Sequence, residues 1–206
     1  MMRAIRHTQR GATVLEVLVA LSLFAVVALA GSWVFSATFR AWTAGRDLAD
    51  EQQNARLVLE WMVRRIRLAG FNVTSTAEYF GEATATSVAF LADVDADGTP
   101  EWHRFCLEPT EGVVRAETGA ISPGCTPATG APVTSRGLRP PRVLALRFAY
   151  YDGRQSPLGP LPLTAGQRPG IARVRITLRI DSNRSGALDA GDLTITMDAV
   201  VRHYGG

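Results

Sequence analysis

Four short stretches of this sequence carry residues whose types and spacing could support chemistry. The first is Gly11-Ala12-Thr13-Val14-Leu15-Glu16, where a bond between two small residues is followed by one carboxylate at the start of a long apolar run. A carboxylate at the mouth of a membrane-length helix is costly to bury, so its presence calls for a functional reason. The other stretches are a pair of cysteines and two acidic loops.

The cysteine pair consists of Cys106 and Cys125, which are the 2 cysteines of the chain. An even count and a loop of about 18 intervening residues allow a disulfide worth about 3 kcal/mol on the chain-entropy model. Disulfides persist outside the cytoplasm, which is where the rest of the sequence places this segment. Two unpaired thiols are the alternative, because spacing alone does not fix the geometry of a bridge.

Both acidic loops match the first half of a calcium-binding loop, in which oxygen donors alternate before a glycine. The first contains Asp93, Asp95 and Asp97, but its twelfth position is Arg104 instead of a bidentate acid. The second offers more donors, so the candidate calcium ligands are Asp181, Asn183, Asp189 and Asp192. A hairpin turn is the alternative for both loops, since Asp, Asn and Gly favour turns.

The apolar run extends from Val17 to Phe39 without a charged residue. About 23 residues of α-helix are long enough to cross a hydrocarbon core of about 30 Å. The basic residues ahead of this run should stay in the cytoplasm, which places everything after Phe39 outside. These residues are Arg3, Arg6, His7 and Arg10. We therefore expect a single-pass protein of the inner membrane.

A secretory signal peptide is the alternative for the same run. Ala28-Leu29-Ala30 fits a small-residue cleavage site, and cleavage after Ala30 would release a soluble binding domain. Two observations weigh against it: Trp33, Phe35 and other apolar residues continue the pattern, and Glu16 is unusual at the start of a signal-peptide core.

The stretch from Gly11 to Glu16 resembles the prepilin cleavage and methylation motif of type IV pilins and type II secretion pseudopilins. The resemblance implies that prepilin peptidase cuts between Gly11 and Ala12, so that residues 1–11 are a leader and the helix is kept. It also implies N-methylation of Ala12 and makes Glu16 the fifth mature residue. Most family members begin with Phe where this chain has Ala12.

Glu16 has a physical role that agrees with this resemblance. The α-amino group of Ala12 would be positively charged near neutral pH, and Glu16 lies one helical turn away. The carboxylate can pair with that amine, or with the amine of a neighbouring subunit, which would offset a desolvation cost of several kcal/mol per ion. The alternative is that Glu16 only extends to the lipid headgroups.

Helical periodicity continues beyond the membrane segment. It predicts one helix from Ala12 to Ala69, about 85 Å long, with an assembly half at 12–39 and an amphipathic half within 40–71. Gly70 is a suitable stop. The segment Glu60 to Phe71 resembles the end of the helix in PilW-like minor pilins, and the J-type pseudopilins have a similar long helix.

Residues 72–206 change to two-residue alternation with frequent turn residues, which predicts a β-rich domain. Ile171–Ile180 is clearest, because apolar side chains alternate with Arg173, Arg175, Thr177 and Arg179. We expect an antiparallel sheet laid on the long helix, an α+β fold, and the resemblance implies the pilin fold. The other predicted strands are Ser87–Ala92, Glu101–Glu108, Gly112–Glu117, Arg142–Tyr151 and Leu193–Arg202, with loops at 122–141 and 155–170.

No enzyme motif stands out in the sequence. It lacks a nucleophile elbow, a phosphate-binding Gly loop and a zinc-ligand spacing, and we expect His103 and His203 to be structural. The net charge of +3 is spread among acids, so the composition argues against nucleic-acid binding; DNA capture would require a basic surface patch.

These observations favour a minor type IV pilin of the PilW type, a structural subunit that primes or joins pilus assembly. The expected partners are other minor and major pilins, prepilin peptidase, the inner-membrane assembly platform and membrane lipid. A minor pseudopilin of a type II secretion system is the related alternative. After leaving the inner membrane, the subunit would lie in the pilus, in the periplasm or at the cell surface.

Overall fold

The computed structural model describes residues 13–73, 78–108, 110–119, 125, 131–132, 142–182 and 185–202. The chain forms two compact units, Met1–Asp47 and Leu48–Gly206, and the long helix contributes to both. Of the residues expected to carry function, Gly11, Ala12 and Asn183 lie outside the described residues, and so does His203, which we expected to be structural.

The helix α1 runs over Val14–Ile66, 53 residues, against a predicted span from Ala12 to Ala69. Its C-terminal end is earlier because the last turn tightens: the amides of Leu68 and Ala69 donate to carbonyls three residues back, at 3.0 Å each. Gly70 then adopts φ +83°, and its amide donates to the carbonyl of Leu91 at 2.9 Å. A β-carbon at Gly70 would lie 3.0 Å from the Tyr79 ring, so both space and backbone conformation favour glycine.

The N-terminal unit contains the apolar part of α1. Residues Val14–Thr43, 30 in all, are long and apolar enough to cross a membrane, and an 18-residue window within them has a mean hydropathy of 2.5. From Val14 to Trp42 the side chains are exposed within the described chain; Trp33, for example, is 81% exposed. This surface therefore needs a cover that the chain itself does not supply.

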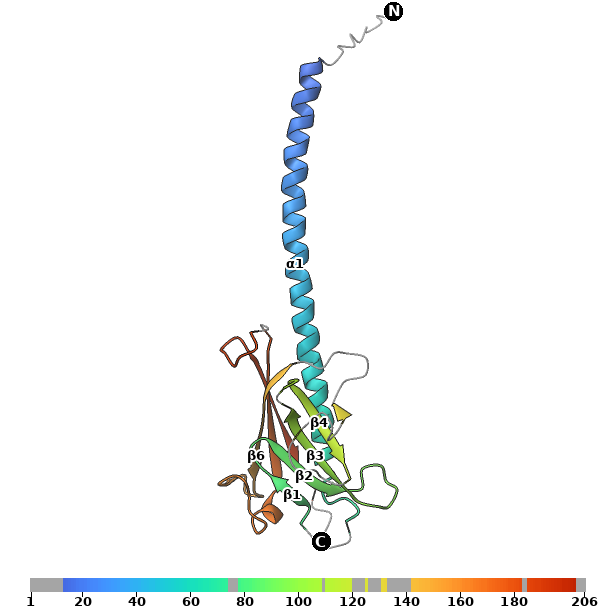
Figure 1. Cartoon of the computed structure of the whole chain (residues 1–206), viewed down its shortest axis with the longest axis vertical. Coiled ribbons are helices and arrows are strands. Elements are labelled where there is room, and N and C mark those ends of the chain that lie inside the picture. The colour runs from blue at the N-terminus through green and yellow to red at the C-terminus, as the bar shows by residue number, and fades with distance from the viewer. Residues whose placement is uncertain are drawn as a thin grey trace, which may run out of the picture. The chain divides into compact units, whose positions relative to one another are not determined.

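The C-terminal unit contains two antiparallel sheets (Figure 1). In the first, the strand order follows the chain order: β1 (Phe80–Ala83), β2 (Ser87–Ala92), β3 (Glu101–Glu108), β4 (Val113–Thr118) and β5 (Ala131–Pro132). The second has the order β7-β6-β8-β9, formed by β6 (Val143–Tyr151), β7 (Pro157–Leu158), β8 (Arg173–Ile180) and β9 (Leu193–Val200). A short 3₁₀ helix, η1 (Arg168–Gly170), precedes β8.

The fold is α+β, as predicted, but it contains two sheets where we expected one. Alternation along a strand shows which face is buried, whereas the identity of the neighbouring strand depends on distant residues. Isolated contacts join the sheets: the amide of Phe148 donates to the carbonyl of Ala85 at 2.9 Å, and the Tyr150 hydroxyl donates to the carbonyl of Thr84 at 2.9 Å. Strands β1, β5 and β7 were not predicted; β5 and β7 lie in segments expected to be loops.

The core of this unit lies where the last turns of α1 meet the inner faces of both sheets. Leu59, Met62 and Ile66 are fully buried, and the Trp61 ring packs edge-on against Phe105 with centroids 5.4 Å apart. The alternation predicted for β8 is confirmed, since Val174, Ile176, Leu178 and Ile180 are buried while the arginines between them are half-exposed. The amphipathic half of the helix thus covers the apolar strand faces.

Candidate functional site

The first turn of α1 is the candidate functional site, and Thr13 starts it. The Thr13 hydroxyl oxygen accepts a hydrogen bond from the amide of Glu16 at 3.3 Å, and the Thr13 carbonyl accepts one from Val17 at 3.2 Å. Thr13 is therefore the N-cap of the helix. Thr followed by Glu three residues later is a capping-box sequence. This pattern in the sequence already indicates a helix that starts at Thr13, although we expected the helix to begin at Ala12.

Glu16 lies in this first turn with its side chain exposed. An acid at this position interacts favourably with the partial positive charge of the helix N-terminus. The pairing of Glu16 with the amine of Ala12 stays a prediction, because Ala12 lies outside the described residues. Cleavage after Gly11 and methylation of Ala12 stay predictions for the same reason.

The helix beyond Glu16 satisfies its own polar groups. The hydroxyls of Ser32, Ser36 and Thr38 donate to the carbonyls of residues one turn earlier, at 2.8, 2.8 and 2.9 Å. No hydroxyl of these three needs water, which suits a helix in lipid or in an apolar bundle. The rings of Phe39 and Trp42 lie near the end of the apolar segment, tilted against each other with centroids 6.1 Å apart, and such rings are common at membrane interfaces.

The first acidic loop brings its carboxylates together. Oxygens of Asp93, Asp95 and Asp97 lie within 4.8 Å of one another, although this loop was considered the weaker calcium candidate. Asp93 is buried, and its carboxylate accepts hydrogen bonds from Asn72 Nδ2 at 2.8 Å and from the amide of Gly98 at 3.0 Å. The bond from Asn72 lowers the pKa of Asp93, despite its burial. The buried Asp93 thus holds the turn in shape.

The second acidic loop also uses its carboxylates locally. Asp181 accepts a hydrogen bond from the amide of Gly186 at 2.9 Å. Asp192 accepts hydrogen bonds from the amide of Asp189 at 2.8 Å and from Arg179 Nη2 at 3.2 Å. These are the contacts of a hairpin turn. A calcium ion held by Asp181, Asn183, Asp189 and Asp192 stays a prediction.

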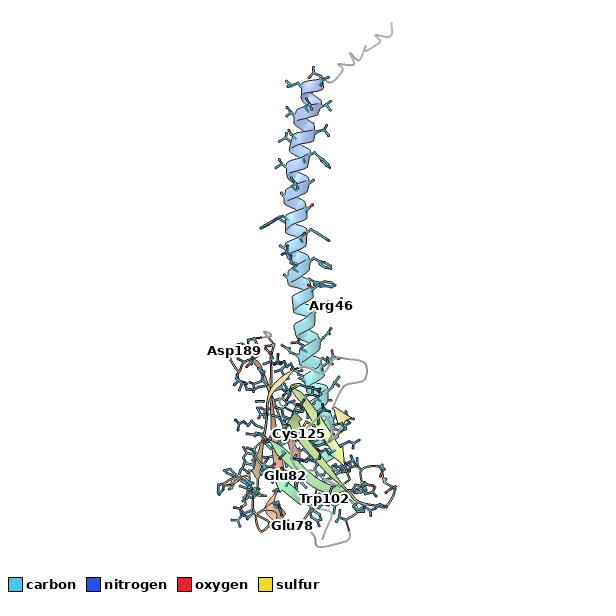
Figure 2. The ribbon with its side chains drawn as sticks, in the orientation of Figure 1. Arg46, Glu78, Glu82, Trp102, Cys125 and Asp189 are labelled. Atoms are coloured by element: carbon cyan, nitrogen blue, oxygen red, sulfur yellow. A yellow bond between two sulfur atoms is a disulfide. The ribbon has the colours of Figure 1, made fainter. Side chains whose placement is uncertain are left out.

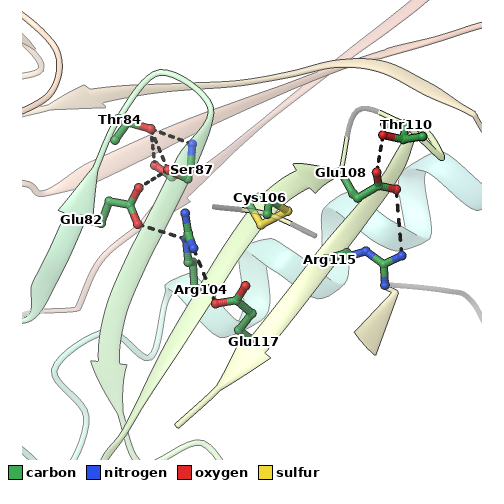
Figure 3. The surroundings of a disulfide bond; sticks show 10 residues. Glu82, Thr84, Ser87, Arg104, Cys106, Glu108, Thr110, Arg115 and Glu117 are labelled. Carbon is green, nitrogen blue, oxygen red and sulfur yellow. Dashed lines mark hydrogen bonds and ion pairs between the residues drawn. A yellow bond between two sulfur atoms is a disulfide. The ribbon is translucent and has the colours of Figure 1, made fainter. Parts of the chain in front are cut away.

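The structure contains a disulfide between Cys106 and Cys125, with Cα atoms 6.0 Å apart. Charged side chains surround it on the outer face of the first sheet (Figure 3). Arg104 lies 3.0 Å from Glu82 and 3.6 Å from Glu117, and Arg115 lies 2.7 Å from Glu111. Arg104 and Glu117 are both buried, so each needs the opposite charge of the other. Residue spacing alone does not reveal this cluster, because strand pairing brings its members together.

His103, which we expected to be structural, and its neighbour Trp102 lie on opposite faces of β3. His103 is buried on the core face of β3, 5.6 Å from the Phe90 ring, with its Nδ1 3.3 Å from the Thr118 hydroxyl. Trp102, labelled in Figure 2, lies on the opposite face beside Gly81, where a β-carbon would approach the ring to 2.6 Å. Neither arrangement brings together the groups of a catalytic site.

Comparison with known proteins gives a match to a short N-terminal motif and a similarity to solved structures. Residues 6–32 match the family model described as the prokaryotic N-terminal methylation motif. No curated protein matches the sequence. Among solved structures, a type IV-like pilin from Thermus thermophilus is similar, with 16% sequence identity and a TM-score of 0.47 over 75% of this chain and 94% of that chain.

Proposed function

We propose that this chain is a minor type IV pilin of the PilW type. Prepilin peptidase removes residues 1–11 by cutting after Gly11, and the new N-terminal residue, Ala12, is methylated. The observation that carries this proposal is the methylation-motif match at residues 6–32, which includes Gly11, Ala12 and Glu16. The Lys-free basic leader ahead of it keeps the cleavage site on the cytoplasmic side.

The retained helix would then lie first in the membrane and later in a fibre. Before assembly, lipid covers the exposed apolar surface of Val14–Thr43. In a fibre, the corresponding helices of neighbouring subunits replace the lipid, and close packing is the main source of stability between apolar helices. Glu16 pairs with an N-terminal amine in this bundle. The partners are other minor and major pilins and the inner-membrane assembly platform.

The chain's own residues determine which cut is made. A secretory cut after Ala30 would fall inside the matched motif and would remove the first 17 residues of α1, Val14–Ala30. A cut after Gly11 keeps the capped first turn with Thr13 and Glu16. We therefore prefer the prepilin pathway to a secreted soluble domain.

Sequencing the N-terminus of the mature protein tests this proposal. We expect Ala12, carrying a methyl group, as the first residue. Gly11→Leu should leave an unprocessed chain that begins at Met1, whereas Ala30→Leu, the matched control, should be processed as the wild type is. A mature chain that begins at Gly31, and that Ala30→Leu abolishes, would reject the pilin proposal.

The pilus role and the J-type pseudopilin role differ in their partners. Purification of the full chain from membranes should recover pilus minor and major pilins with it. Recovery of type II secretion components instead would assign the chain to a pseudopilus and would leave the processing argument intact.

A further inference from the structure

Two buried carboxylates lie opposite each other where the loop between β8 and β9 begins and ends. The final pair of the β8–β9 ladder comes immediately before Asp181 and immediately after Asp192, so these two residues occupy the next opposite positions. The hairpin stays closed beyond them, because the Ser182 hydroxyl donates to the carbonyl of Gly191 at 2.7 Å. Opposite residues of an antiparallel pair have β-carbons about 5 Å apart. The two acidic side chains are therefore immediate neighbours.

Each of these carboxylates has one oxygen without a donor. The side chains of Asp181 and Asp192 are 1% and 0% exposed. Oδ2 of Asp181 accepts a hydrogen bond from the amide of Gly186 at 2.9 Å and lies 3.8 Å from Arg142 Nη1. Oδ2 of Asp192 accepts from Arg179 Nη2 at 3.2 Å and from a main-chain amide at 2.8 Å.

The Oδ1 atoms of Asp181 and Asp192 are both buried, and neither has a hydrogen-bond partner in the described part of the chain. A charged oxygen that is removed from water without a donor or a cation costs free energy. Two like charges at opposite positions of a hairpin also repel each other. A cation between the two Oδ1 atoms would remove both costs, because it binds the free oxygens and offsets their charge.

The spacing of this loop is that of a calcium-binding loop. Asp181 and Asp192 are the first and twelfth residues of a 12-residue stretch, the positions at which such a loop has carboxylate ligands. The sixth residue is Gly186, with φ +73°, and calcium loops have glycine there for a sharp turn. The twelfth residue is Asp in place of the usual Glu, so it would bind through its one free oxygen.

In the first acidic loop, by contrast, the buried carboxylate has donors on both oxygens. Oδ1 of Asp93 accepts from the amide of Asp97 at 3.1 Å, and Oδ2 accepts from Asn72 Nδ2 and from the amide of Gly98. The twelfth position of this loop is Arg104, which is a cation and not a ligand for one. The turn at Asp93 is therefore satisfied without a metal ion.

We propose that the β8–β9 loop binds one calcium ion through Oδ1 of Asp181 and Oδ1 of Asp192. Main-chain carbonyls and water complete the set of about six to eight oxygen ligands that calcium takes. Arg142 and Arg179 keep their contacts with the Oδ2 atoms. Two carboxylates are fewer than tight calcium loops provide, so we expect a Kd of about 0.1–1 mM, as in extracellular modules.

Calcium binding to the full-length protein in non-ionic detergent micelles, stripped with EDTA and then dialysed, tests this proposal. Titration calorimetry should give one calcium site per chain. Magnesium should bind at least about tenfold more weakly, because it keeps its water and requires a tight octahedral shell. Calcium chloride at 10 mM should raise the Tm by about 5 °C. No calcium binding, or an equal effect of magnesium chloride, would overturn the proposal.

Variants of the two loops locate the ion. Asp181→Asn and Asp192→Asn each retain an oxygen for the existing hydrogen bonds and lose the charge, so each should weaken calcium binding by about tenfold or more. Circular dichroism in EDTA checks that each variant is folded. Asp95→Asn, in the first acidic loop, is the matched control and should respond to calcium as the wild type does. A calcium response that Asp95→Asn abolishes, or that both other variants retain in full, would contradict the proposed site.

Discussion

At the scale of single residues, Thr13 and Glu16 set how the helix begins. The Thr13 hydroxyl caps the first turn by accepting a hydrogen bond from the amide of Glu16. Glu16 therefore contributes to the cap through its main chain and not through its carboxylate. The side-chain carboxylate is then available for an N-terminal amine. These two contributions can be separated by substitution, because an amide at position 16 retains capping ability and loses the charge.

We expect Glu16→Gln and Glu16→Ala to be made, inserted in the membrane and processed, but poorly incorporated into fibres. The reason is that each leaves an N-terminal amine without its counter-ion in an apolar bundle, at a cost of several kcal/mol. The measurement is the amount of the protein in sheared fibres relative to membranes. Thr13→Val is the control: it removes the cap, worth about 1 kcal/mol, and should assemble nearly normally. Normal incorporation of Glu16→Gln would refute the charge pairing.

His103 gives the C-terminal unit a pH dependence. Burial, together with the nearby Arg65, lowers the pKa of His103 below its ordinary value. The unfolded chain then binds a proton more readily than the folded chain, so stability is complete above about pH 6.5 and falls as the pH drops below that value. The urea midpoint should therefore decrease from pH 7.5 to pH 5.5, and His103→Gln should lessen the decrease. An unchanged decrease in the variant would assign it to other groups.

At the scale of elements, strand pairing creates the buried charges on the outer face of the first sheet. The register places Glu82 beside Ala89 on β2, Ala89 beside Arg104 on β3, and Arg104 beside Glu117 on β4. The neighbouring row places Cys106 beside Arg115, next to the disulfide. Each of these side chains is half-buried or buried. The outer face of this sheet is thus a charged layer, although its charged residues belong to three different strands, β1, β3 and β4.

Replacing one charged residue of this layer should lower the free energy of unfolding more than replacing both residues of an ion pair. Arg104→Met leaves the buried Glu117 without its cation, and we expect a loss of about 3 kcal/mol in the free energy of unfolding. The double variant Arg104→Met with Glu117→Leu should recover most of that loss, because both buried charges are gone. Urea denaturation measures both values. A double variant that is less stable than Arg104→Met would show that Glu117 has another stabilising partner.

At the scale of the whole molecule, the two units differ in what covers their apolar side chains. The N-terminal unit exposes an apolar helix that needs lipid or other helices, whereas the unit Leu48–Gly206 has its own core. That core includes Val58, Leu59, Met62, Val63 and Ile66 of α1. The later turns of the helix are therefore part of the folded domain as well as an extension of the membrane segment.

A fragment of residues 48–206 should fold in water without detergent. It keeps the apolar face of α1 that covers both sheets, and it lacks Val14–Thr43. We expect a cooperative thermal transition and an intact disulfide between Cys106 and Cys125. The matched fragment, residues 68–206, lacks that face and should expose the inner strand faces, giving no cooperative transition. Cooperative folding of the shorter fragment would show that the sheets form a core without the helix.

The sequence by itself determined the features that depend on neighbouring residues. These are the apolar segment, the helix to within three residues at each end, the alternation of β8 and the α+β class. It also identified the two cysteines that the structure joins. Helical and strand periodicity are local properties, and a chain with only two cysteines allows only one intramolecular bridge. The motif from Gly11 to Glu16 is equally local, so a family model covering residues 6–32 detects it.

Only the tertiary structure decided which strands pair. The division into two sheets, the burial of Arg104 and Glu117, and the meeting of Asp93, Asp95 and Asp97 depend on residues far apart or on the path of a loop. Alternation of polar and apolar residues assigns a side chain to a face but not to a neighbour, because every strand with that pattern could pair with several others. Packing of the described strands around one helix removes that freedom.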